Sequence, residues 1–296
     1  MSTRFTSVAS PIFPGPDSVF RTIVVGHDGK PGADVALRLA EQLAADGATL
    51  LLARVIPAER ALARALSHGR EPPRREPSRR EAAASELEAL CAGVGGTLQV
   101  AARVITAPSA ARGLAAIAEE EGADLIVVGP DRRPGDFRAH TGLGLRLLRG
   151  APCAVAIAPA DADFELRHVG VAYDGSPEAE RALEAAYEVA QRLGVACTLY
   201  LAVLPPTEPA LDAQLVHREA GALLDAAAER APEGVDPATV IVPGFPSSAL
   251  AGRVAGVIDL LVLGSRRQGP LQRALLGSTS RAIGLEVDCA LLVTPR

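Results

Sequence analysis

The chain has 296 residues, of which 48% are hydrophobic, 22% charged and 3% aromatic, and its formal net charge is −5. This is a globular composition with enough apolar side chain for two cores. The acidic balance argues against binding to nucleic-acid phosphates or anionic membranes, and the scarcity of aromatics argues against stacking along a nucleic-acid strand.

Residues 1–20 are polar and proline-rich, without the apolar stretch of a signal peptide. No run of about 18 apolar residues predicts a membrane span. We therefore expect a cytoplasmic protein that makes no membrane contact.

Short apolar runs then alternate with helical patterns. The expected strands are residues 21–26, 48–55, 98–104, 124–129, 153–158, 167–172, 196–203, 238–242, 259–264 and 289–293. The expected helices are residues 32–46, 78–92, 109–121, 141–149, 177–193, 208–230, 247–256 and 277–286. This alternation predicts right-handed crossovers and doubly wound parallel sheets.

The second half of the chain repeats the first. TIVVGHDGKP at 22–31 returns as HVGVAYDGSP at 168–177, and DLIVVG at 124–129 returns as DLLVLG at 259–264. The period is too long for a solenoid, so we predict two domains. Their expected bounds are 20–160, the first repeat, and 165–296, the second repeat.

Ligands of open parallel sheets bind beyond the carboxyl ends of the strands, where the strand order reverses. In the second repeat Asp174 follows the first strand and Gly264 ends the fourth. Glycines at both ends of the following loop allow backbone N–H groups to turn inward, and Gly277-Ser278-Thr279 opens a helix that favours an anion. The pattern predicts a phosphate site. The alternative is that Gly264 and Gly277 only form turns and Ser278 only caps a helix.

With this loop and the strand-end Asp, both repeats resemble the universal stress protein family, from about Arg21 to Pro159 and from Leu166 to Arg296. The resemblance implies a tandem protein whose two Rossmann-like or flavodoxin-like, three-layer α/β/α domains have strand order 3-2-1-4-5. It also implies pairing of Val155–Ala158 with Leu291–Thr294 in an internal pseudo-dimer.

One subclass of this family binds ATP. The resemblance therefore implies a nucleotide-binding stress-response or signalling module, with Mg²⁺ as a companion ion and no catalytic role. Asp174 would contact the nucleoside, and the backbones of Ala172 and Val203 would border the adenine. The implied nucleotide site comprises Ala172, Tyr173, Asp174, Val203, Gly264, Ser265, Arg266, Arg267, Gln268, Gly269, Gly277, Ser278 and Thr279.

The second repeat departs from the family signature once. The signature is Gly, two residues, Gly, nine residues, then Gly and Ser or Thr, and Arg267 replaces its middle Gly. A side chain there disfavours a positive φ, whereas Arg266 or Arg267 can supply charge to a phosphate.

The first repeat departs further. Asp131 and Asp136 lie in its loop and would repel phosphate, and Thr141-Gly142 falls where Gly277-Ser278 sits, so the hydroxyl at the helix start is lost or misplaced. The first repeat is therefore either a second nucleotide-binding domain or a structural partner for the second repeat. The residues of that second site would be Gly26, His27, Asp28, Val55, Gly129, Gly135, Thr141 and Gly142, with Val55 matching Val203.

His27 and Tyr173 precede the two aspartates. We interpret them as strand-end side chains that contact a ligand or a helix, with a general-base role for His27 as the alternative. Lys30, in place of Ser176, predicts a weaker helix cap.

Cys153 and Cys289 occupy the same place in the two repeats and are expected to be small buried hydrophobes. There is no C-x-x-C pair, and His140 and His168 lack ligand spacing, so no metal site is expected.

A second hypothesis is a related scaffold that binds a protein partner or further copies of the chain without nucleotide, which the Arg267 departure favours. A third, an adenylating ligase of a related α/β superfamily, is disfavoured. Those enzymes use a Ser-Gly-rich loop after the first strand, where this chain has DGKP and DGSP.

Overall fold

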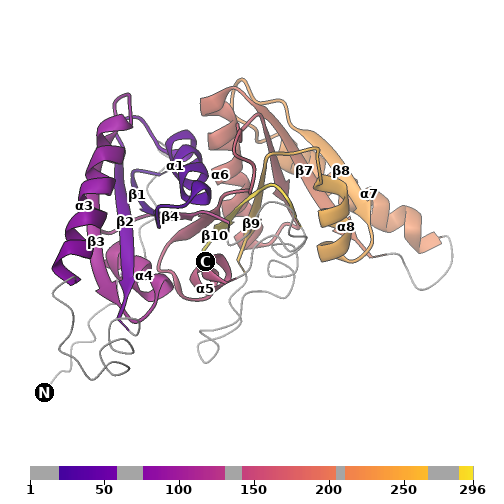
Figure 1. Ribbon diagram of the computed structural model, residues 1–296. Coiled ribbons are helices and arrows are strands. Elements are labelled where there is room, and N and C mark those ends of the chain that lie inside the picture. Colours follow the sequence, from indigo (N-terminus) through magenta and orange to yellow (C-terminus); the bar gives the residue numbers. More distant parts are fainter. Residues whose placement is uncertain (1–19, 59–75, 131–141, 205–210, 266–286, 296) are drawn as a thin grey trace, which may run out of the picture.

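The computed structural model describes residues 20–58, 76–130, 142–204, 211–265 and 287–295 (Figure 1). The elements of the first repeat are β1 (Thr22–Gly26), α1 (Pro31–Leu43), β2 (Thr49–Pro57), α3 (Glu76–Gly93), β3 (Gln99–Ala107), α4 (Ala110–Glu120), β4 (Leu125–Val128), α5 (Leu143–Gly150) and β5 (Ala154–Ile157). Those of the second are β6 (His168–Ala172), α6 (Pro177–Leu193), β7 (Ala196–Val203), α7 (Leu211–Ala228), β8 (Ala238–Pro243), α8 (Pro246–Val254), β9 (Leu260–Gly264) and β10 (Ala290–Thr294).

All ten expected strands are confirmed, and so are the expected helices that fall on described residues. The helix expected at 277–286 lies outside them. Helix α6 matches its expected bounds because its ends are marked locally. Ser176 caps it by accepting from the Ala179 N–H at 3.3 Å, Pro177 follows, and Gly194 ends it at φ 64°. Lys30 makes no side-chain cap at α1, as expected.

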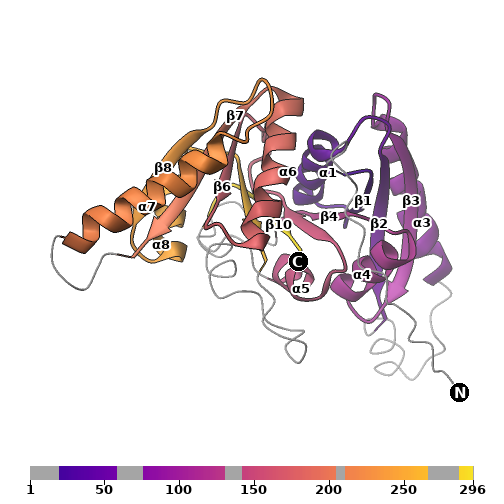
Figure 2. The same cartoon turned by 180° about the vertical axis from the view of Figure 1, so that it is seen from behind.

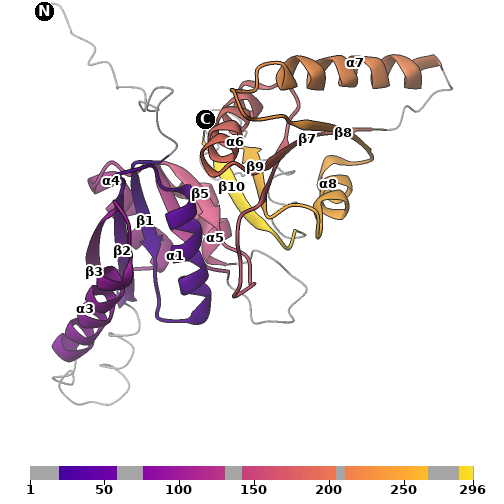
Figure 3. The ribbon, with the colours of Figure 1, turned by 90° about the horizontal axis from the view of Figure 1, so that it is seen from above.

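The ten strands form one sheet in the order β3-β2-β1-β4-β5-β10-β9-β6-β7-β8. Each repeat therefore has the expected order 3-2-1-4-5. The two five-stranded sheets join into one mixed sheet, because β5 and β10 pair antiparallel as expected, with Ala156 opposite Leu292. Figure 3 shows this junction at the middle of the molecule. The pairing leaves neither apolar strand as an exposed edge.

Helices cover both faces of the sheet. Helices α1, α3, α6 and α7 pack on one face, and α4, α5 and α8 pack on the other. Helices α3 and α7 lie at the two far ends of the molecule (Figure 2).

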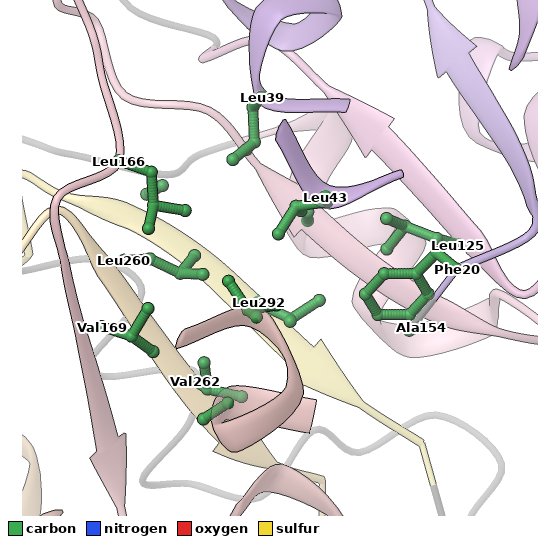
Figure 4. Close-up of a cluster of buried hydrophobic side chains, with 14 of the residues drawn as sticks. Phe20, Leu39, Leu43, Leu125, Ala154, Leu166, Val169, Leu260, Val262 and Leu292 are labelled. Atoms are coloured by element: carbon green, nitrogen blue, oxygen red, sulfur yellow. The ribbon is translucent and has the colours of Figure 1, made fainter. Parts of the chain in front are cut away.

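The core of the first face runs without interruption through both repeats. Leu39 and Leu43 of α1 belong to the same buried cluster as Leu166, Val169 and Leu292, and Figure 4 shows them facing one another across the junction. The Leu166 N–H also donates to Gln42 Oε1 at 2.8 Å. The two repeats are therefore held together by this side-chain packing as well as by the pairing of β5 with β10.

Candidate functional site

The strand order reverses beside β1 and β4 in the first repeat and beside β6 and β9 in the second. At the second reversal the fold brings Asp174, just after β6, close to Gly264 at the end of β9. At the first reversal it does the same for Asp28 and Gly129. These are the places where doubly wound sheets bind ligands.

Both aspartates shape the turn that enters the next helix. Asp174 is exposed, and its Oδ1 accepts the Ser176 N–H at 3.1 Å. Asp28 is also exposed, and its Oδ1 accepts the Lys30 N–H at 3.2 Å, while its Oδ2 pairs with Lys30 Nζ. The intervening Gly175 and Gly29 have φ of 73° and 82°. Each carboxylate is thus held at the carboxyl edge of the sheet by an Asx turn.

Gly129 and Gly264 are required by packing. A Cβ on Gly264 would lie 2.3 Å from the Glu178 carbonyl oxygen in α6, and one on Gly129 would lie 2.3 Å from the Gly32 oxygen in α1. Gly264 therefore has a structural role that requires no phosphate. That role is the close approach of a helix to the strand, and not the turn that the sequence suggested as the alternative.

The strand-end side chains of His27 and Tyr173 contact the following helices. His27 Nε2 lies 3.1 Å from Asp34 Oδ1, and the Tyr173 hydroxyl donates to Glu180 at 2.5 Å. Both side chains are buried. Burial, and then the bond to Glu180, raise the pKa of Tyr173. Each of these strand-end side chains thus contacts the helix that follows it, which is one of the two contacts expected of it.

Arg230, which follows α7, extends the contact in the second repeat. Its guanidinium donates to the Tyr173 hydroxyl at 3.1 Å and pairs with Glu180 at 2.9 Å. No sequence signal singled out Arg230, because the residues it joins are far apart along the chain.

The equivalence of Val55 and Val203 is wrong by one residue. Gly26 of β1 pairs with Ala53, whereas the matching Ala172 of β6 pairs with Tyr200. Ala202 is therefore the counterpart of Val55, and Leu201 is the counterpart of Arg54. Because a shift of one residue reverses the face of a strand, Val55 and Val203 pack on opposite faces of the sheet.

Arg54 lies across the strand ends of the first repeat. Its Nε donates to the His27 carbonyl at 3.1 Å, and its Nη1 pairs with Glu86 of α3. A Cβ on Gly29 would lie 3.0 Å from its Nη2. The side chain is only 14% exposed. The sequence signal for Arg54 is a cation within the otherwise mostly apolar strand β2.

The predicted phosphate loops fall largely outside the described residues: Gly135 and Thr141 in the first repeat, and Arg266, Arg267, Gln268, Gly269, Gly277, Ser278 and Thr279 in the second. Ser265 is buried, and its N–H donates to Thr294 O at 3.0 Å. Gly142 is the N-cap of α5 at φ 76° and provides no side-chain cap. The N-cap position of α5 therefore carries no hydroxyl, whereas Thr141 lies outside the described residues.

The cysteines are unsuited to nucleophilic chemistry. Burial raises the pKa of Cys153, Cys197 and Cys289 to about 12, which keeps the three thiols protonated at neutral pH.

Within the described part of the chain, no group of three His, Cys, Asp or Glu side chains is arranged to hold a metal. None of the helices found there has the length and apolar character needed to cross a membrane.

Comparison with known proteins agrees with the architecture. The family model described as "Universal stress protein family" matches residues 20–159 and 165–295. The Mycobacterium tuberculosis universal stress protein Rv2005c is 34% identical over 173 residues, which cover 54% of this chain and 58% of that protein. The chain thus spans little more than half the length of the curated relatives it matches.

The solved structures that match nearly the whole chain include the following two. A universal stress protein from Archaeoglobus fulgidus has a TM-score of 0.63 and 18% identity, covering 94% of this chain and 97% of its own. The functionally unknown protein PA1789 from Pseudomonas aeruginosa has a TM-score of 0.64 and 19% identity, covering 93% and 92%. At these identities the likeness shows the fold alone.

Proposed function

We propose that this chain, which belongs to the universal stress protein family, binds an adenine nucleotide such as ATP at the carboxyl edge of its second repeat. The nucleotide, with Mg²⁺ as companion, acts as a ligand that favours one conformation of a stress-response module. The proposal treats 20–160 and 165–296 as its two domains. It assigns no catalytic role, and it treats His27, which is buried and contacts Asp34, as a structural side chain.

The difference between the two sets of strand ends supports placing the site in the second repeat. In the first repeat Arg54 covers the turn after β1, and Lys30 pairs with the carboxylate of Asp28. In the second repeat the counterpart of Arg54 is Leu201, which is buried in the core, and Ser176 replaces Lys30. An incoming nucleoside therefore meets Arg54 and Lys30 at the strand ends of the first repeat, where the second repeat has Leu201 and Ser176.

In this proposal the exposed carboxylate of Asp174 accepts from the nucleoside, and the half-buried backbones of Ala172 and Val203 border the base. The loop that begins at Gly264 supplies amides to the phosphates. A carboxylate that accepts a hydrogen bond contributes about 1.5–3 kcal/mol.

The test is equilibrium dialysis of the full chain with ATP and Mg²⁺, comparing the Asp174→Ala and Asp28→Ala variants. We expect Asp174→Ala to weaken ATP binding by about tenfold or more, because the nucleoside loses a charged acceptor. We expect Asp28→Ala to bind as the unmodified chain does.

The two variants are matched, since each removes one Asx turn before a helix. Equal losses of thermal stability would show that the difference in binding is not a folding effect. Unchanged ATP affinity in Asp174→Ala would reject the site.

The second candidate function is a partner-binding module that holds no nucleotide. It is favoured by the packing of Gly129 and Gly264 against α1 and α6, which explains both glycines without a phosphate. Mass spectrometry of protein purified without added nucleotide discriminates the two: co-purified adenine nucleotide supports the first candidate, and ligand-free protein that binds ATP weakly supports the second.

A further inference from the structure

Two of the four large apolar side chains that are exposed among the described residues follow adjacent strands at the carboxyl edge of the second repeat. Phe245 is 70% exposed and Leu204 is 52% exposed. They come just after Val203 and Pro243, which pair across β7 and β8, and the Gly244 N–H donates to Val203 O at 2.9 Å. Phe245 is thus positioned next to the end of β7.

Phe245 occupies a position where helix formation favours a different residue. It is the N-cap of α8 and makes no side-chain cap. In the first repeat the N-cap of the corresponding helix α4 is Ser109, whose hydroxyl accepts the Arg112 N–H at 3.3 Å. An N-cap position favours a small polar residue, and the Phe245 ring neither caps the helix nor is buried in the core. A residue that departs from such a preference without stabilising the fold is typical of a functional site.

The backbone under this ring is constrained. Pro246 holds Phe245 in extended conformation, at φ −66° and ψ 132°. On the other side of Phe245 the chain reads Pro243-Gly244. Gly244 has φ 128°, and its N–H donates a hydrogen bond to the Val203 carbonyl. An aromatic side chain on such a segment loses little conformational freedom when a ligand packs on it.

The position also fits the proposed nucleotide. Strands β6, β7 and β8 are neighbours, and adjacent strands lie about 5 Å apart. Strands β7 and β8 extend beyond β6, because Ala172 at the end of β6 pairs with Tyr200 and the last pair of β7 and β8 is Val203 with Pro243. A nucleoside that contacts Asp174 after β6 and borders Val203 at the end of β7 has its far end directed toward the segment that follows β8. That segment is Gly244-Phe245, which enters α8.

We infer that Phe245 forms the base subsite of the second repeat, with its ring stacked on the nucleobase and Leu204 extending the apolar surface. This inference rests on the proposed function. Stacking uses the π-face of the base and not its hydrogen-bonding edge, so it supplies affinity for a nucleobase without selecting its functional groups.

The experiment is isothermal titration of the full chain with ATP and, separately, with inorganic tripolyphosphate, which has no base. We expect Phe245→Ala to weaken ATP binding about tenfold and to leave tripolyphosphate binding unchanged. Phe245→Tyr keeps the ring and should retain ATP affinity. Val257→Ala, which truncates an exposed apolar side chain before β9 at the opposite edge of the sheet, is the control and should bind both ligands normally.

The outcomes separate the two proposals. ATP binding by the unmodified chain with equal affinity in Phe245→Ala overturns the base subsite and leaves the proposed function in place. An equal loss of ATP and tripolyphosphate binding also overturns it, since the ring would then act on the phosphates or on the fold. Absence of ATP binding by the unmodified chain overturns both.

Discussion

At the scale of single residues, glycine at the end of the fourth strand of each repeat is needed for the helix to approach the sheet. We predict that Gly264→Ala lowers the free energy of unfolding by about 1–3 kcal/mol, because the new Cβ would meet the Glu178 carbonyl at 2.3 Å. Gly129→Ala should cost a similar amount, since Gly32 lies equally close. Urea denaturation measures both.

Gly252→Ala is the matched control. Gly252 lies in α8 with nothing within 4 Å of an added Cβ, so alanine should stabilise the chain by about 0.5–1 kcal/mol. If Gly264→Ala instead kept full stability but lost ATP binding, the glycine would serve the phosphate and not the helix.

At the scale of elements, the helices α4 and α8 are related by the repeat but begin differently. We predict that Ser109→Ala destabilises the chain by about 1 kcal/mol, because the Arg112 N–H loses its acceptor. Phe245→Ser should stabilise it by about 1 kcal/mol, because α8 gains a cap it lacks. Thermal unfolding measures both changes, and a loss of stability in Phe245→Ser would show that the ring is part of the fold.

At the scale of the whole molecule, one sheet and one core cluster run through both repeats, so the repeats should unfold together. We predict that Leu292→Ala, at the β5–β10 junction, costs about 2–5 kcal/mol and accelerates amide exchange in both repeats equally. Hydrogen exchange read by mass spectrometry at β1 and β6 measures this. An effect confined to the second repeat would show that the two repeats unfold independently.

Strands, helices and their order in each repeat could be predicted, since they depend on local patterns and on an internal repeat. Ser176, Pro177 and Gly194 mark the ends of α6 by chemistry that acts within a few residues. The β5–β10 pairing was also expected, from the family resemblance. Individual side-chain contacts between distant segments could not be predicted, and Arg54 with Glu86 is the clearest case.

The sequence by itself determined that this chain is a duplicated α/β protein, because apolar periodicity, capping residues and repetition are all carried along the chain. Only the tertiary structure decided that Ala202, not Val203, occupies the place of Val55, and that Gly264 faces the first turn of α6. Only it joined Gly244, the residue before Phe245, to Val203 at the end of β7. The physical reason is that strand register and the approach of a helix to a sheet are set by packing between segments far apart in sequence, and a shift of one residue reverses the face on which a side chain lies.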